Sequence, residues 1–295
     1  MDRRTTYFVL FSGVIAVSFA AIFIRWAEAP ASVIAFYRMG LASIVWFPLV
    51  WLRHRSEFQA LSRRQAVWLM AGGTCLALHF LLWIQSMDYT SVASSVFFVT
   101  TQPIFVAAAS IWLLREPVTR RLAAGIVLSL AGTVIIGVGD FSPGETQFFG
   151  NLLGIGGAVM AAGYLLIGRL LRQTLSLQLY AGCVYGISAA ILLAFVLITM
   201  QPLTGFTHFT WLNLLLLALV PTLIGHTSFN WVLKYLPPAV VSVAILGEPI
   251  GATFLAYWLL NEPPGFHTLS GGLLIISGIY LAVTHRRAGK RPRPD

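Results

Sequence analysis

The sequence predicts an all-α integral membrane protein whose ten transmembrane helices form two inverted five-helix repeats. Of the 295 residues, 58% are hydrophobic and only 10% are charged, and the mean hydropathy is +0.82. Soluble proteins average about 25% charged residues, so lipid must be the solvent for most of this chain. In addition, the apolar residues fall into ten long runs, and the chain matches itself at an offset of 146 residues.

Each apolar run can cross a hydrocarbon core of roughly 30 Å, which takes about 20 residues of helix. The runs are continuously apolar, which favours helices over a barrel, and the connections are too short to fold separately. The first run contains Tyr7 to Ile24 and exceeds a signal-peptide core of about 7–15 residues, so we expect a retained helix. The ten expected spans are 6–25, 31–52, 66–87, 91–114, 121–139, 149–170, 177–200, 210–233, 239–260 and 269–285.

Basic residues occupy alternate connections. If the N-terminus is cytoplasmic, seventeen of the nineteen Lys and Arg residues lie inside, leaving Arg25 outside and Arg38 within the second span. The outer connections carry acidic residues instead. The positive-inside rule therefore predicts a multi-pass protein of the inner (plasma) membrane with both termini cytoplasmic. Because these charges lie in short gaps between apolar runs, the net charge of +9 does not indicate nucleic-acid binding.

The internal match is ungapped across the last two spans of each half. At an offset of 146, Pro103 aligns with Pro249, Trp112 with Trp258, and Glu116-Pro117 with Glu262-Pro263. We therefore expect one membrane domain made of residues 1–145 and 146–295. Since each half holds five spans, the second copy enters the membrane in the opposite sense. Inverted repeats are typical of alternating-access carriers, in which each half can adopt the other's conformation. A channel or a structural protein does not need them.

Other functional classes lack their motifs. The chain has no phosphate-binding Gly-x-x-x-x-Gly-Lys-[Ser/Thr] loop, no His-Glu-x-x-His and no Gly-x-Ser-x-Gly, so we expect neither an ATP-driven pump nor an enzyme. Cys75 and Cys183 lie far apart in apolar runs and have no metal-ligand spacing. No metal and no cofactor is expected.

Several segments resemble the EamA branch of the drug/metabolite transporter superfamily, and the resemblance covers nearly the whole chain. They are Phe23-Ile24-Arg25-Trp26-Ala27, Phe36-Tyr37-Arg38, Gly225-His226-Thr227-Ser228-Phe229-Asn230-Trp231, Leu246-Gly247-Glu248-Pro249 and Leu260-Asn261-Glu262-Pro263. The resemblance implies a basket of ten helices with a central substrate and secondary transport, most often export of amino acids or related metabolites. It leaves the substrate open, since relatives carry aromatic amino acids, toxic cations or nucleotide-like metabolites.

Glu248 is the first candidate for substrate binding or coupling. It lies near the middle of the ninth span, where an ionised carboxylate is costly unless it is paired, and this suits it to bind and release protons. The alternative is a structural partner of Arg38 or a helix-bending device. Gln102 occupies the matching position of the first half. Pro103, Pro249 and Gly247 interrupt the same two spans and are the expected hinges.

The remaining candidates are polar groups at membrane depth. Arg38 suits a substrate carboxylate, or else it is a structural arginine that snorkels or pairs with Glu248. His79 and His226 are expected to line the cavity from its two sides, unless each is a hydrogen-bonded core residue. Asn230 either contacts substrate or bridges helices, and Trp83 either lines the cavity or packs in the core.

Together these features predict a secondary active transporter that exports amino acids or related small metabolites or drugs and is a candidate for proton coupling. Its expected partners are a small-molecule substrate and the lipid bilayer, and it is expected to be a monomer or homodimer. The alternatives are a carrier of nucleotide-like or lipid substrates, an intramembrane enzyme or a membrane protein that does not transport.

Overall fold

The computed structural model describes residues 2–90, 92–138, 145–260 and 265–284, and helices are the only regular elements within these ranges. The helices of the first half are α1 (Arg3–Ser18), α2 (Ala20–Trp26), α3 (Ala31–Arg53), α4 (Arg55–Gln59), α5 (Arg63–Ser86), α6 (Val92–Val99), α7 (Gln102–Ala109), the π-helical turn η1 (Ser110–Leu114) and α8 (Arg120–Val138). Those of the second half are α9 (Glu145–Leu171), α10 (Leu177–Ile198), α11 (His208–Leu217), the π-helical turn η2 (Ala218–His226), α12 (Thr227–Val232), α13 (Pro238–Ile245), α14 (Glu248–Leu260) and α15 (Phe266–Val283).

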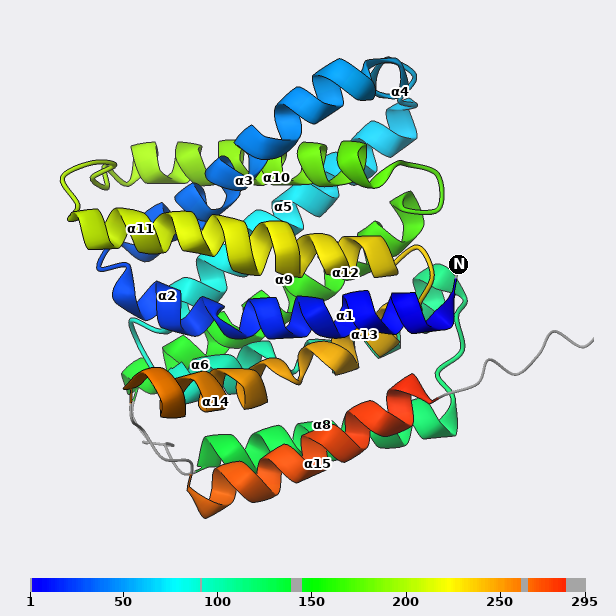
Figure 1. The fold of residues 1–295 in the computed structure, drawn as a ribbon, viewed down its shortest axis with the longest axis vertical. Coiled ribbons are helices and arrows are strands. Elements are labelled where there is room, and N and C mark those ends of the chain that lie inside the picture. The colour runs from blue at the N-terminus through cyan, green and yellow to red at the C-terminus, as the bar shows by residue number, and fades with distance from the viewer. Residues whose placement is uncertain (1, 91, 139–144, 261–264, 285–295) are drawn as a thin grey trace, which may run out of the picture.

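These helices confirm the predicted fold class. In the described part of the chain, nine continuous or broken helices are long and apolar enough to cross a membrane. The tenth expected span is α8, which lies along the full length of α15 (Figure 1). We refer to the ten as spans 1 to 10. Span 1 is α1 with α2, span 4 is α6, α7 and η1, span 8 is α11, η2 and α12, and span 9 is α13 with α14.

The two halves interlock through their first spans. Span 1 packs against spans 8 and 9 of the second half, and span 6 (α9) packs against spans 3 and 4 of the first half. Each half therefore presents its third and fourth spans to the first span of the other half. These crossed contacts place the polar residues of spans 3, 4, 8 and 9 at a common centre.

The last spans of the two halves run antiparallel to each other, which is the geometry of an inverted repeat (Figure 1). A side chain added at Gly132 in α8 would place its Cβ 2.4 Å from the backbone oxygen of Gly271 in α15, and the converse distance is also 2.4 Å. Because no Cβ fits at this separation, glycine is required at both positions for the two backbones to meet.

Spans 4 and 9 are broken at equivalent places. Span 4 is interrupted between Val99 and Gln102, and span 9 between Ile245 and Glu248, so the two breaks differ by the repeat offset of 146. Both prolines lie in the first turn of the helix that follows, where the missing N–H has no intrahelical partner in any case. The expected kinks are thus helix starts, and each break directs a helix N-terminus toward the molecular centre.

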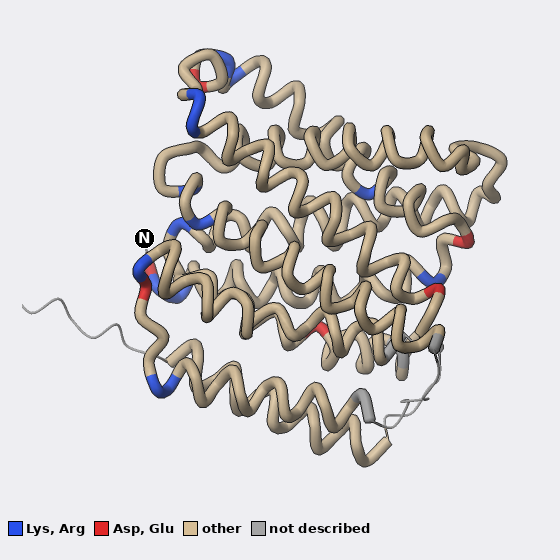
Figure 2. Tube along the Cα trace, turned by 180° about the vertical axis from the view of Figure 1, so that it is seen from behind, with Lys and Arg blue, Asp and Glu red and all other residues tan. Residues whose placement is uncertain are grey.

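Charges gather at the two ends of the helices. Figure 2 shows most Lys and Arg residues at the end that holds the N-terminus, which we call the basic end, whereas acidic residues lie at both ends. The Glu262-Pro263 pair and the basic residues of the C-terminal tail (Arg286, Arg287, Lys290, Arg291 and Arg293) lie outside the described residues.

Candidate functional site: a central polar cavity

A cavity with an accessible volume of about 50 Å³ lies where the two halves interlock. Its walls come from spans 1, 3, 4, 6, 8 and 9, with one further side chain from span 2. Among the lining residues are six candidates from the sequence: Arg38, His79, Trp83, Gln102, His226 and Glu248.

Arg38 is the span 2 contribution and is only 1% exposed. Its Nε donates a hydrogen bond to Thr222 Oγ1 (2.9 Å), and its guanidinium lies 4.1 Å from the centre of the Phe80 ring. Its terminal Nη1 is buried and has no hydrogen-bond partner among the described residues. The arginine is therefore held in place while part of its donor capacity is unused.

The acceptor that holds Arg38 arises from an irregular turn in span 8. Pro221 lacks an N–H and cannot donate to the carbonyl of Leu217 four residues earlier, so the helix widens into the π-helical turn η2. The Thr222 hydroxyl donates to that carbonyl instead (2.9 Å), which leaves its lone pairs for Arg38. Thus Pro221 and Thr222 together fix the orientation of the arginine.

Glu248 is the first residue of α14 and reaches the same cavity from the other half. It makes no ion pair with Arg38, and no hydrogen bond to it is found within the described residues. Its position at a helix N-terminus favours a negative charge. Gln102, its equivalent in the first half, is the first residue of α7 and also lines the cavity.

The two histidines differ in their hydrogen bonding. His79 Nδ1 lies 3.0 Å from the carbonyl oxygen of Gly157, and since a carbonyl only accepts, this nitrogen carries the proton. The His79 ring is stacked on Trp83, with centroids 6.0 Å apart and an interplanar angle of 10°. His226 Nδ1 and Trp83 Nε1 are buried without hydrogen-bond partners in the described structure.

Asn230 does not line the cavity and lies behind its wall. It accepts a hydrogen bond from the Tyr164 hydroxyl (2.5 Å) and donates one to the Tyr185 hydroxyl (3.2 Å), which lies 3.1 Å from Thr227 Oγ1. Tyr164 itself lines the cavity. Asn230 therefore joins spans 6, 7 and 8, as in the helix-bridging alternative, and sets the position of Tyr164.

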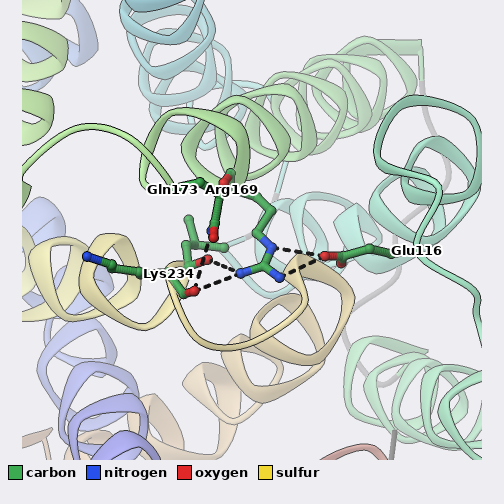
Figure 3. Close-up of polar contacts among 5 residues, drawn as sticks. Glu116, Arg169, Gln173 and Lys234 are labelled. Carbon is green, nitrogen blue, oxygen red and sulfur yellow. Dashed lines mark hydrogen bonds and ion pairs between the residues drawn. The ribbon is translucent and has the colours of Figure 1, made fainter. Parts of the chain in front are cut away.

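The basic end is clamped by an ion pair between the two halves. Arg169, near the end of α9, donates through Nε and Nη2 to Glu116 Oε1 at 3.0 and 2.8 Å. Its Nη1 donates to the carbonyl oxygens of Leu233 (2.7 Å) and Lys234 (3.0 Å), and the whole arrangement is visible in Figure 3. One guanidinium thus ties together the ends of spans 4, 6 and 8.

Comparisons with known proteins agree with this architecture. The model of the EamA-like transporter family matches residues 4–138 and 148–284. A protein of Archaeoglobus fulgidus named as an uncharacterized transporter is 30% identical over 281 residues, which cover 90% of this chain and 91% of that one. The uncharacterized transporter YetK of Bacillus subtilis is 25% identical over 264 residues, covering 88% and 78% of the two chains.

A solved crystal structure superposes with a TM-score of 0.80 at 19% identity and covers 96% of this chain and 99% of the other, which shows the shared fold alone. The family model matches both halves of the chain, and the two relatives that are similar in sequence are named as transporters. The protein is therefore a multi-pass membrane transporter that belongs to the EamA-like transporter family.

Proposed function

We propose that the protein is a secondary active carrier of small zwitterionic metabolites, amino acids or close relatives, and that it works by alternating access. The observation that carries this proposal is the arrangement of Arg38 and Glu248. These opposite charges reach one cavity from different halves and are not paired with each other. A substrate with a carboxylate and an ammonium group would pair with both charges, the carboxylate with Arg38 and the ammonium group with Glu248.

Each wall of the cavity suits one part of such a substrate. The free Nη1 of Arg38 and the free Nε1–H of Trp83 are donors for a carboxylate. Glu248 would accept from the ammonium group. Trp83, Tyr164 and Phe229 add apolar surface for the substrate's own side chain.

The small size of the cavity supports the alternating-access part of the proposal. Ligand pockets are typically about 300–1,000 Å³, whereas this cavity is about 50 Å³ and has room for only a few water molecules. A solute therefore needs the halves to move apart. Arg169 and Glu116 would separate when the basic end opens, and the breaks beside Pro103 and Pro249 would act as hinges.

The charge distribution supports a cytoplasmic basic end in an inner (plasma) membrane, with both termini inside. The resemblance to exporters supports outward transport. Glu248 is the candidate for proton coupling, since a carboxylate inside the membrane gains most from binding either a proton or a cation.

The test is counterflow in proteoliposomes. Vesicles are loaded with each of a panel of unlabelled amino acids and small organic cations, and uptake of the labelled compound is followed. Accumulation of a zwitterionic amino acid is the expected result. Accumulation of cations only, or of no compound although the protein is folded, contradicts the amino-acid proposal and favours nucleotide-like or lipid substrates.

Proton coupling is tested separately, with a variant of Glu248. Glu248→Gln is expected to abolish the pH dependence of counterflow while leaving the protein folded, because the amide keeps the shape and loses the titration. Glu57→Gln, at the basic end and outside the cavity, is the matched control and should keep that pH dependence. An unchanged pH profile in Glu248→Gln would contradict the proposal of proton coupling.

A further inference from the structure

A second cavity, of about 430 Å³, lies apart from the central site, between α3, α4, α5 and α10. We call it the lateral groove. Its lining is almost entirely apolar, and Phe47, Trp51, Phe58 and Met70 are all about half exposed or more. A Cβ built on Gly186, which also lines the groove, would meet no atom within 4 Å, so the groove is unfilled at that point.

The groove runs from the basic end into the membrane. Its α4 residue, Phe58, lies in the connection at that end, and its deepest α10 residue, Ile187, is ten positions after the helix start at Leu177. At 1.5 Å per residue this is roughly 15 Å, about half of the hydrocarbon core. An acyl chain of a lipid in that leaflet lies at this depth.

Four arginines surround the mouth of the groove: Arg53 ends α3, Arg55 starts α4, and Arg63 and Arg64 start α5. All four are exposed, and neither of the two ion pairs found in the described residues involves them. The guanidinium of Arg55 lies 4.8 Å from the centre of the ring of Trp51, a groove residue. The mouth is therefore a cluster of unneutralised positive charge at headgroup level.

The nearby carboxylate is already engaged. Glu57 Oε2 lies 3.1 Å from His54 Nδ1, and Glu57 Oε1 accepts a hydrogen bond from the backbone N–H of Ser176 (2.7 Å). It ties α4 to the start of α10 and does not pair with the arginines. The four arginines therefore remain open to an external anion.

We infer that the lateral groove binds one anionic phospholipid, with an acyl chain against Gly186 and the phosphate among the four arginines. The apolar cavity and the basic mouth match the two parts of such a lipid. A second copy of this chain fits less well. A twofold parallel contact would bring the same four arginines of both copies together, and like charges repel.

The test is native mass spectrometry of the full-length protein released from detergent, titrated with phosphatidylglycerol or with phosphatidylcholine. We expect one tightly bound phosphatidylglycerol and weaker binding of phosphatidylcholine. Gly186→Leu fills the groove and should weaken the first binding step at least about tenfold, because the burial of several methylene groups is lost. Ala131→Leu, a comparable enlargement at an exposed site in the middle of α8, which does not line the groove, should leave it unchanged.

A second pair of variants tests the headgroup contact. Arg53→Gln with Arg55→Gln should weaken phosphatidylglycerol binding roughly thirtyfold and leave phosphatidylcholine binding unchanged. Arg120→Gln with Arg121→Gln removes the same charge at the start of α8 and is the control. These exposed positions keep the test open should Gly186→Leu fail to fold. Equal binding in wild type and groove variants, equal affinity for both lipids, or a dimer that Gly186→Leu dissociates would each overturn the inference.

Discussion

Ser129 in α8 donates its hydroxyl hydrogen to the backbone carbonyl of Ile275 in α15 (3.4 Å), and the two residues are separated by 146 positions, the offset of the internal repeat. Equivalent positions of the two halves therefore touch each other. Contact between equivalent positions occurs only beside the axis that relates them, so the pseudo-twofold axis passes between α8 and α15 at this point. The close approaches of Gly125 to Gly278 and of Gly132 to Gly271 flank it and exchange under the same operation.

Gly132→Ala is expected to lower the free energy of unfolding by about 1–3 kcal/mol, because the new Cβ would lie 2.4 Å from Gly271 O and force the helices apart. Gly186→Ala is the matched control. Its Cβ meets nothing within 4 Å, so the better helix propensity of alanine should raise stability by roughly 0.5–1 kcal/mol. Thermal unfolding in detergent measures both, and shifts of the same sign in the two variants would refute the packing argument.

Glu116→Gln is expected to open the basic end more often, since Arg169 loses the carboxylate that joins span 4 to spans 6 and 8. The measurement uses one cysteine, at the cavity position Leu165, in a background lacking Cys75 and Cys183. An impermeant maleimide applied from the basic end should label it faster in the variant. Glu57→Gln removes another carboxylate from that end and should not change the rate. Equal labelling of all three proteins would show that the ion pair does not close this side.

Most of the fold could be predicted from apolar run lengths, because a span must match the bilayer whatever its neighbours are. The breaks within the spans were harder to predict from the sequence. Span 1 is divided at Phe19, where the Ser18 hydroxyl bonds back to the carbonyl of Val14 (2.8 Å), and serine back-bonding of this kind bends helices. The sequence held no clear signal for it. Pro221, in contrast, stood in the middle of the eighth span and could have indicated the irregular turn η2.

The candidate site was predictable in its charged and aromatic members because polar groups at membrane depth are rare enough to stand out. Thr222 and Tyr164 were missed. A threonine is ordinary in such helices, and only the neighbouring Pro221 shows that its hydroxyl has a free carbonyl to bind and can then accept from Arg38. The sequence predicted that Arg38 and Glu248 share a region, but whether they pair depends on tertiary distances that it does not contain.

The connection between α4 and α10 should give an acid-dependent loss of stability. Burial alone raises the pKa of Glu57, but hydrogen bonds from Ser176 and His54 outweigh it and hold the pKa below the usual 4.5. A lowered pKa in the folded state contributes stability above pH 4.5, which is lost as the pH falls through the folded-state pKa. Wild type should therefore unfold at a higher temperature than Glu57→Gln at neutral pH, and the difference should close in acid.

Asp88 is the contrasting case for the same measurement. Burial raises the pKa of Asp88, so its ionised form destabilises the fold, and this penalty is absent at acid pH and grows as the pH rises through the raised pKa. Asp88→Asn should consequently be more stable than wild type at neutral pH and equal to it in acid. If Glu57→Gln and Asp88→Asn both raised, or both lowered, the unfolding temperature at neutral pH, the hydrogen bonds to Glu57 would not explain its effect on stability.

Thr222→Val tests whether the orientation of Arg38 sets substrate affinity. Valine keeps the shape of threonine but removes the hydroxyl, so Arg38 Nε loses its acceptor and the carbonyl of Leu217 loses its donor. A lost hydrogen bond to a charged group corresponds to about 1.5 kcal/mol, so KM for counterflow should rise about tenfold while kcat changes little. Thr222→Ser restores the hydroxyl and should restore KM. A purely structural role would instead lower thermal stability in Thr222→Val and leave KM unchanged. An arginine that does not contact the substrate cannot change the affinity for the substrate when its own orientation changes.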